Sequence, residues 1–165
     1  MANNDSMEMA LVEELRDILY SEKQLVDVIP KMVKAAESEE LKSAFETHLR
    51  ETEGHVQRVQ QALEMLGESA RGKKCKGMVG ITDEGADLIK HHDTGPVLDA
   101  ILVGAAQKVE HYEIASYGTA IAWAERLGQS NISSLLNETL DEEKATDEKL
   151  TELSRKINIE APASA

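Results

Sequence analysis

Hydrophobic residues recur along the first 37 residues at the three- and four-residue spacing of one helix face. A single acid, Glu22, interrupts this face, whose other members are Leu11, Leu15, Ile18, Leu25, Ile29, Met32 and Ala36. Burying an ionised carboxylate without a partner costs several kcal/mol, so this position requires a cation, a proton or water. The pattern predicts a helix over about 6–37, capped by Asp5 or Ser6 and kinked at Pro30.

The next stretch keeps the same periodicity and predicts a second helix over about 39–66. Ser38 can cap its start, and Gly67 ends the pattern. The apolar face consists of Leu41, Phe45, Leu49, Val56, Val59, Leu63 and Leu66. Because almost nothing separates the two helices, we expect them to form an antiparallel hairpin.

Residues 67–95 lack the helical spacing of apolar residues and are predicted to connect the first pair of long helices to the second pair. The segment GESARGKKCKG is basic and loop-like, a short helix is predicted over about 78–90, and HHDTGP is a turn signal. Two further long helices follow over about 96–127 and 131–157. The pattern predicts an all-α, ferritin-like four-helix bundle with one long crossover connection and a short extra helix, in a single domain over 1–165.

The second and fourth long helices match each other at a separation of 91 residues. The matched apolar positions are Leu41, Ala44, Phe45 and Leu49 in one helix, and Ile132, Leu135, Leu136 and Leu140 in the other. The same separation relates Glu51 to Glu142. We therefore expect two hairpins that present carboxylates symmetrically.

Composition narrows the classes of partner. The 165 residues include 31 acidic and 18 basic side chains, and the net charge of −13 repels nucleic acid and anionic lipid while attracting metal cations. No apolar run approaches the ~20 residues that span a bilayer. The start, MANNDSMEM, lacks the features of a secretory signal, and Cys75 is the single cysteine, so we expect a cytoplasmic protein without an internal disulfide.

Acids also interrupt the inward faces of the later helices. Glu110 and Glu113 lie at the centre of an otherwise uncharged row formed by Val103, Ala106, Tyr117, Ala120, Ala124 and Leu127. In the last helix the row of Leu136, Leu140 and Leu150 includes two acids, Glu143 and Asp147, and Glu142 lies on the adjacent row. Periodicity does not decide between Glu142 and Glu143, and Asp147 can equally be a salt-bridge partner.

The second helix adds imidazoles, because His48, Glu51 and His55 follow one edge of its apolar face. Carboxylates with one or two imidazoles and no thiolate suit iron or manganese, and two ions neutralise more of the charge than one. The candidate metal ligands are Glu22, Glu51, His55, Glu110, Glu113, Glu143 and Asp147, with His48 the alternative to His55. We expect two iron ions per chain, with manganese as the other candidate, and oxygen or peroxide binding across them.

Five segments resemble the bacterial YciE/YciF family, and they are closer to its YciF branch. In order along the chain they are YSEKQL (20–25), HLRETEGHV (48–56), KKCKGM (73–78), AAQKVEHYEIASYGT (105–119) and DEEKATD (141–147). The resemblance implies a ferritin-like fold, a role in bacterial stress responses, a homodimer and a dinuclear metal motif. Carried over by position, the motif residues are Glu22, Glu51, Glu110, Glu113 and Glu143.

Two positions depart from the family pattern. Members of the family can have Gln at the position of His55, and YciF-like chains read Met-Glu-Gly where this chain reads Met78-Val79-Gly80. The second departure removes an acid, so a site that used it as a ligand has one fewer here.

These features together predict a stress-response protein with a carboxylate-rich dinuclear site that reacts with peroxide or oxygen or handles iron. As an enzyme it would be a di-iron or di-manganese oxidoreductase of the ferroxidase or peroxidase type. The alternative is a non-catalytic helical dimer that binds another protein or sequesters metal. Val12, Leu19 and Trp123 are candidates for the dimer surface, unless each belongs to the core.

Overall fold

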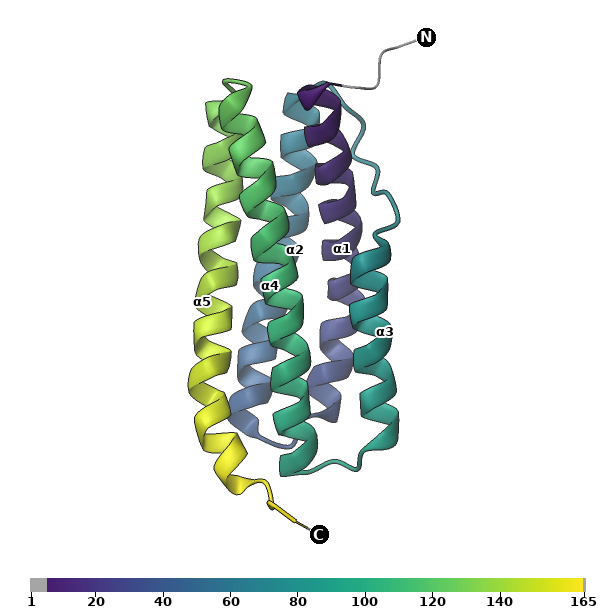
Figure 1. The fold of residues 1–165 in the computed structure, drawn as a ribbon, viewed down its shortest axis with the longest axis vertical. Coiled ribbons are helices and arrows are strands. Elements are labelled where there is room, and N and C mark those ends of the chain that lie inside the picture. Colours follow the sequence, from purple (N-terminus) through teal and green to yellow (C-terminus); the bar gives the residue numbers. More distant parts are fainter. Residues whose placement is uncertain (1–5, 165) are drawn as a thin grey trace.

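The computed structural model describes residues 6–164, and within them the chain forms five helices and no strand. The helices are α1 (Met7–Ala35), α2 (Glu39–Met65), α3 (Lys76–His91), α4 (Pro96–Arg126) and α5 (Ser130–Glu160). Four long helices lie side by side, and α3 runs along the outside of α1 and α4 (Figure 1). The all-α bundle with one long crossover and a short extra helix is thereby confirmed.

The helix ends follow the local signals. Ser6 caps α1 by accepting a hydrogen bond from Met9 N at 3.2 Å, and Ser38 caps α2; Asp5, the other predicted cap, lies outside the described residues. Helix α1 continues through Pro30, and α2 and α4 are followed by Gly67 and Gly128 in the left-handed region, at φ 73° and 71°.

Three boundaries differ from the prediction by two residues or more. Helix α1 ends at Ala35, two residues before its predicted end. Helix α3 begins at Lys76 rather than near Met78, because the thiol of Cys75 caps it by accepting from Met78 N at 3.3 Å. Helix α5 continues to Glu160, three residues beyond the predicted end. Cysteine is not a residue type from which a cap is expected, so the sequence pattern missed the start of α3.

The crossover connection is tied to the bundle by close contacts. Lys73 N donates to the carbonyl of Arg16 at 2.9 Å, and the Cys75 thiol lies 3.1 Å from the Tyr112 hydroxyl. Gly77 leaves room for that ring, since a Cβ at this position would lie 2.6 Å from the hydroxyl oxygen. These contacts explain the KKCKGM segment as a structural element that holds α3 against α4.

The structure corrects the predicted dimer surface. Val12 and Leu19 are buried, at 1% and 0% exposure, and Trp123 is half-buried. The interpretation of Val12 and Leu19 as outward-facing was wrong, because both lie in the apolar core that α1 forms with α2, α4 and α5.

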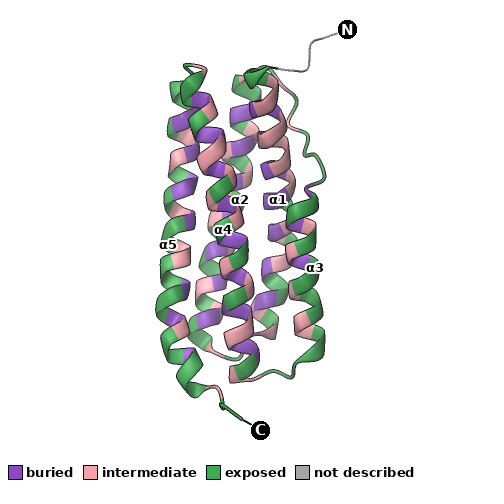
Figure 2. Cartoon of the chain, in the orientation of Figure 1, coloured by how far each residue is buried: buried purple, intermediate pink, exposed green. Residues whose placement is uncertain are grey.

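The apolar core is divided into two parts along the bundle axis. One contains the first half of α1 with the second half of α2, and the other contains the second half of α1 with the first half of α2. Helices α4 and α5 likewise contribute one half of their length to each part. Buried positions follow the inward face of each long helix (Figure 2). Between the two parts every long helix carries buried polar side chains.

No helix among the described residues has the length and apolar composition that a membrane crossing requires.

One side chain joins the end of the first hairpin to α4. The buried carboxylate of Asp99 accepts hydrogen bonds from the backbone N–H groups of Glu37 and Ser38, both at 2.8 Å. These donors belong to the turn between α1 and α2, where the helices leave backbone groups without partners.

We expect Asp99→Ala to lower the free energy of unfolding by about 2–4 kcal/mol, because two buried donors lose a charged acceptor. Asp99→Asn, which keeps one acceptor oxygen, should lose less. Urea denaturation measures both, and the exposed Asp93→Ala serves as a control with a change within about 0.5 kcal/mol. An Asp99→Ala variant as stable as the wild type would contradict this role.

Candidate metal centre

Buried polar side chains from all four long helices meet between the two apolar cores. Helix α1 provides Glu22, α2 provides His48 and His55, α4 provides Glu110 and Glu113, and α5 provides Glu143. All six side chains are at most 5% exposed. The helical periodicity that builds the apolar cores also turns these groups inward, because each replaces an apolar residue on the buried face.

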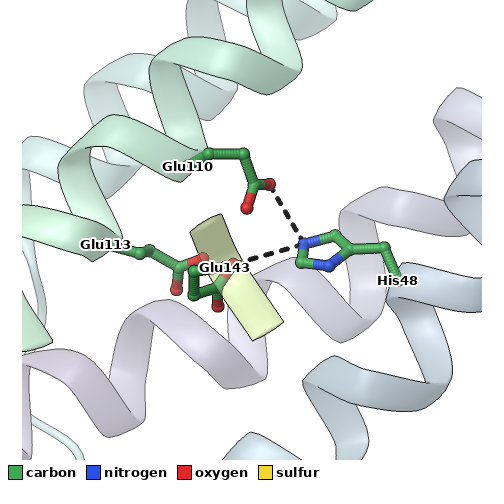
Figure 3. A group of neighbouring side chains, drawn as sticks. All are labelled: His48, Glu110, Glu113 and Glu143. Carbon is green, nitrogen blue, oxygen red and sulfur yellow. Dashed lines mark ion pairs between the residues drawn. The ribbon is translucent and has the colours of Figure 1, made fainter. Parts of the chain in front are cut away.

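Four of these side chains form one group, shown in Figure 3. One ligand atom from each of His48, Glu110, Glu113 and Glu143 lies within 4.8 Å of the others. His48 Nε2 lies 3.1 Å from Glu110 Oε1 and 4.0 Å from Glu143 Oε2. The imidazole from α2 therefore faces three carboxyl groups from α4 and α5.

A second group consists of Glu22, His55 and Glu143. His55 Nδ1 lies 3.0 Å from Glu143 Oε1 and 3.4 Å from Glu22 Oε1. Glu143 thus belongs to both groups, with Oε1 toward His55 and Oε2 toward His48. A carboxylate in this position can bridge two cations.

Most of the ligand atoms in this cluster lack hydrogen-bond partners. Among the described residues ten buried side-chain nitrogen or oxygen atoms have none, and eight of them belong to the cluster: Glu22 Oε2, His48 Nε2, His55 Nδ1, Glu110 Oε2 and both carboxyl oxygens of Glu113 and Glu143. The contacts of His48 Nε2 and His55 Nδ1 at 3.0–3.1 Å are close but are not aligned as hydrogen bonds. Since buried polar groups are normally satisfied, a concentration of this kind fits a bound cation.

Burial shifts the ionisation of the carboxyl groups. It raises the pKa of Glu113 well above its ordinary value, and the neighbouring carboxyl groups of Glu143, Glu22 and Glu110 add to the rise. Burial, and then the charge of Glu110, raise the pKa of Glu143 to about 7. The pKa of Glu22 is also raised by burial, although His55 opposes the change. In the absence of a cation, these shifts favour the protonated form of the carboxyl groups.

Burial lowers the pKa of the two imidazoles, but the neighbouring carboxyl groups raise it by more. Burial lowers the pKa of His55, yet Glu143 and Glu22 outweigh it and raise the value to about 10. Burial likewise opposes protonation of His48, and Glu110 with Glu51 and Glu143 raises its pKa well above the ordinary value. Without metal, the neighbouring carboxyl groups therefore favour the protonated form of both rings.

Further polar side chains hold His55 and Glu22 in place. Glu142 accepts two hydrogen bonds from the Arg58 guanidinium, at 2.7 and 3.0 Å, and its Oε2 lies 2.8 Å from His55 Nε2. The buried Tyr117 hydroxyl donates to Glu22 Oε1 at 2.5 Å. Partners of this kind fix the orientation of metal-binding imidazoles and carboxylates.

The structure brings together five of the seven residues predicted from the sequence, namely Glu22, His55, Glu110, Glu113 and Glu143. The other two, Glu51 and Asp147, lie outside both groups. Glu51 Oε2 lies 3.7 Å from His48 Nδ1, whereas Asp147 accepts from Gln107 Nε2 at 3.2 Å and lies 3.3 Å from His111 Nε2. Each is only partly buried, since the helix turns its side chain toward the rim of the bundle.

The structure also addresses the two alternatives that the pattern left open. His48 and His55 both face the cluster, two helical turns apart on α2. Of the adjacent pair on α5, Glu143 is 0% exposed and belongs to both groups, while Glu142 is half-buried and pairs with Arg58. The sequence analysis offered His48 only as the alternative to His55, and the spacing of seven residues between them was the signal that both face inward.

The separation of 91 residues extends over both hairpins. It relates Glu22 of α1 to Glu113 of α4, and Thr52 of α2 to Glu143 of α5, and all four residues are buried. The same separation relates His55 to Thr146, which is only half-buried. The two hairpins are thus equivalent in their backbone pattern but not in their chemistry, because α2 alone carries the histidines of the cluster.

Comparison with known proteins identifies the family of this chain. A family model described as a domain of unknown function (DUF892) matches residues 6–161. The protein YciF of Escherichia coli (strain K12) is 43% identical over 153 residues, which is 92% of each chain. This chain belongs to the YciF family. The resemblance read from the sequence is confirmed.

Solved structures agree with the membership in the YciF family. The crystal structure of the E. coli stress protein YciF matches with a TM-score of 0.91 and 41% identity, covering 95% of this chain and 99% of that one. A structure of ferritin-like, diiron-carboxylate proteins from Bacillus anthracis str. Ames matches with a TM-score of 0.71 at 16% identity, covering 93% and 99%. The second likeness concerns the fold alone, and it shows that the fold is ferritin-like.

The raised pKa values predict how the metal-free YciF-family protein responds to pH. The folded state keeps a proton on Glu143 that the unfolded chain releases between its ordinary pKa of 4.5 and about 7, and it keeps one on His55 between 6.5 and about 10. Both contributions are present at low pH and are lost as pH rises.

We therefore expect the free energy of unfolding of the metal-free protein to fall by on the order of 3 kcal/mol between about pH 5 and pH 9. Urea denaturation in the presence of a chelator measures it. The loss should be smaller in Glu143→Gln, which removes one of the two titrating groups. A stability that stays level or rises over this interval would contradict the protonation of the cluster.

Proposed function

We propose that this protein binds two iron or manganese ions between its apolar cores and that the loaded protein reacts with oxygen or peroxide, or handles iron, as part of a stress response. The observation that carries this proposal is the position of Glu143, which offers one carboxyl oxygen to each of two groups of unpartnered buried ligand atoms.

The charges of the cluster support two divalent ions. Four carboxylates, from Glu22, Glu110, Glu113 and Glu143, face two imidazoles in a region from which water is excluded. Two divalent cations would balance four ionised carboxylates and leave both imidazoles neutral, which is the form that binds metal. Carboxylate and imidazole ligands without a thiolate favour iron or manganese, and Cys75 contacts Tyr112 instead.

The roles of the residues follow from their positions. Glu143 would bridge, His48 with Glu110 and Glu113 would hold one ion, and His55 with Glu22 would hold the other. Iron or manganese bound in this way supplies the electrons that reduce oxygen or peroxide. Tyr117, Glu142 and Arg58 would keep Glu22 and His55 oriented, and the apolar cores above and below exclude bulk water.

The setting of this function is also a proposal. The relative from E. coli carries the description of a stress protein, and we extend that role to this chain together with a cytoplasmic location and a homodimer. The alternative, a non-catalytic protein that sequesters metal or binds another protein, shares the same fold and differs in whether a bound oxidant is consumed.

We expect the purified protein to bind about two Fe²⁺ or Mn²⁺ per chain under anaerobic conditions. Glu143→Gln should lower the affinity of both positions by more than about 100-fold, since it removes the ligand that they share. Asp147→Asn is the matched control, because Asp147 lies on the same helix but outside both groups. Elemental analysis and calorimetric titration measure the number and the affinity.

The second part of the test is turnover. The wild-type protein loaded with Fe²⁺ should consume oxygen or peroxide in proportion to its bound metal, and the Glu143→Gln variant should not exceed the rate of free Fe²⁺. Metal binding without consumption would favour sequestration. An unchanged metal content in Glu143→Gln would contradict the assignment of the centre.

A further inference from the structure

A groove between α2 and α5 adjoins the metal centre, because two of its lining residues, Glu51 and Thr146, contact His48. It has a volume of about 600 Å³, and its lining also includes Glu39, Glu40, Phe45 and Leu150. Its polar lining includes three carboxylates and one lysine, Lys149. Glu39 and Glu40 pair with Lys42 and Lys156 at 2.7 and 2.6 Å, so among the described residues Glu51 is the lining carboxylate without a lysine partner, and it is the one that can attract a cation.

The imidazole of His48 lies between this groove and the four-residue group. Its Nδ1 is 3.4 Å from Thr146 Oγ1 and 3.7 Å from Glu51 Oε2, both of which line the groove. Its Nε2, on the other side of the ring, faces Glu110 at 3.1 Å and has no hydrogen-bond partner. His48 is only 5% exposed, so one buried ring separates the groove from the centre.

The other imidazole, that of His55, lies against a carboxylate that is held in place by an arginine. Glu142 corresponds to Glu51 at the separation of 91 residues, and it is held by Arg58 through two hydrogen bonds at 2.7 and 3.0 Å. Glu51 has only longer contacts, at 3.7 Å to His48 Nδ1 and 3.4 Å to Thr146 Oγ1. Of the two equivalent carboxylates, therefore, one is held by two short hydrogen bonds from a guanidinium and the other is held less tightly, beside the groove.

Two other cavities do not offer a comparable path. The one between α1, α3 and α4, of about 320 Å³, is lined by residues such as Gln24, Ile81 and Leu102. Among the described residues, none of its lining side chains forms a hydrogen bond or ion pair with the cluster, whereas Glu51 and Thr146 of the groove both contact His48. The gap beside Glu113 and Tyr117 has no volume for a water-sized molecule.

We propose that the groove between α2 and α5 is the path by which divalent cations reach the metal centre, and that Glu51 carries them from the groove to the position at His48. This inference rests on the proposed function and assigns to Glu51 a transfer role instead of a permanent place among the ligands. The two metal positions are then unequal, since the one at His48 exchanges through the groove and the one at His55 is closed off by Glu142 and Arg58.

The rate of metal uptake tests this proposal separately from the amount of metal bound. Co²⁺ serves as the probe, because its d–d absorption reports binding during rapid mixing. In Glu51→Gln we expect both uptake and chelator-driven release to slow by about tenfold at low salt, with the same final number of ions and the same affinity. The difference should shrink at high salt, as screening removes the attraction of the carboxylate.

A steric variant tests the path itself. Ala145→Trp places a large side chain at an exposed position that lines the groove, and Ser134→Trp places one at an exposed position of the same helix outside it. We expect slow uptake and release in Ala145→Trp at unchanged affinity, and wild-type rates in Ser134→Trp. Helix content and thermal unfolding verify that each variant is folded.

The outcomes are distinct. Wild-type rates in both Glu51→Gln and Ala145→Trp would overturn the path. A fall in the number of ions or in affinity in Glu51→Gln would overturn the transfer role, because it would make Glu51 a ligand. A wild-type protein that binds no Co²⁺, Fe²⁺ or Mn²⁺ would instead remove the metal centre, and that result appears before any variant is compared.

Discussion

The rest of the structure depends on the burial of four carboxyl groups and two imidazoles between two apolar cores. Burying an ionised group of this kind without a proton, a partner charge or a cation costs several kcal/mol. That cost is a large share of the ~5–15 kcal/mol that stabilises a domain. Protons can compensate for it in the metal-free protein, as the raised pKa values of Glu113, Glu143 and His55 indicate. The two divalent cations that we propose would do so more completely, since their charge equals that of the four carboxylates. The apolar cores thus provide the stability that allows the bundle to keep a polar centre.

The two hairpins share a pattern of burial but differ in the side chains at equivalent positions. This difference determines which residues make up the cluster. Glu22 and Glu113 are equivalent, whereas Thr52 stands in α2 where Glu143 stands in α5. The cluster gains His48 and Glu110 at positions where the opposite hairpin has Thr139 and Leu19. A symmetric backbone therefore holds an asymmetric set of ligands, with one imidazole fixed by Glu142 and Arg58 and the other beside an open groove.

Much of this arrangement could be predicted from the sequence, because the helical periodicity of apolar residues determines which face of each helix is buried. Glu22 was evident as the one acid in an apolar row, and Glu110 with Glu113 followed the same reasoning. The periodicity could not separate Glu142 from Glu143, since neighbouring residues differ by only about 100° around the helix and both rows border the core. It also allowed Val12 and Leu19 to face outward, because the pattern of α1 alone does not show how wide its buried face becomes when three other long helices pack around it. Contacts between distant segments, such as Arg58 with Glu142, have no local signal at all.

The most direct test of the central claim is a crystal structure of the protein grown with Mn²⁺, with anomalous diffraction recorded to locate the ions. The account predicts two anomalous peaks in each chain, one among His48, Glu110, Glu113 and Glu143 and the other among Glu22, His55 and Glu143. Bonds to both carboxyl oxygens of Glu143 should join them. Mn²⁺ bound only at surface carboxylates, with the buried cluster free of anomalous density, would contradict it.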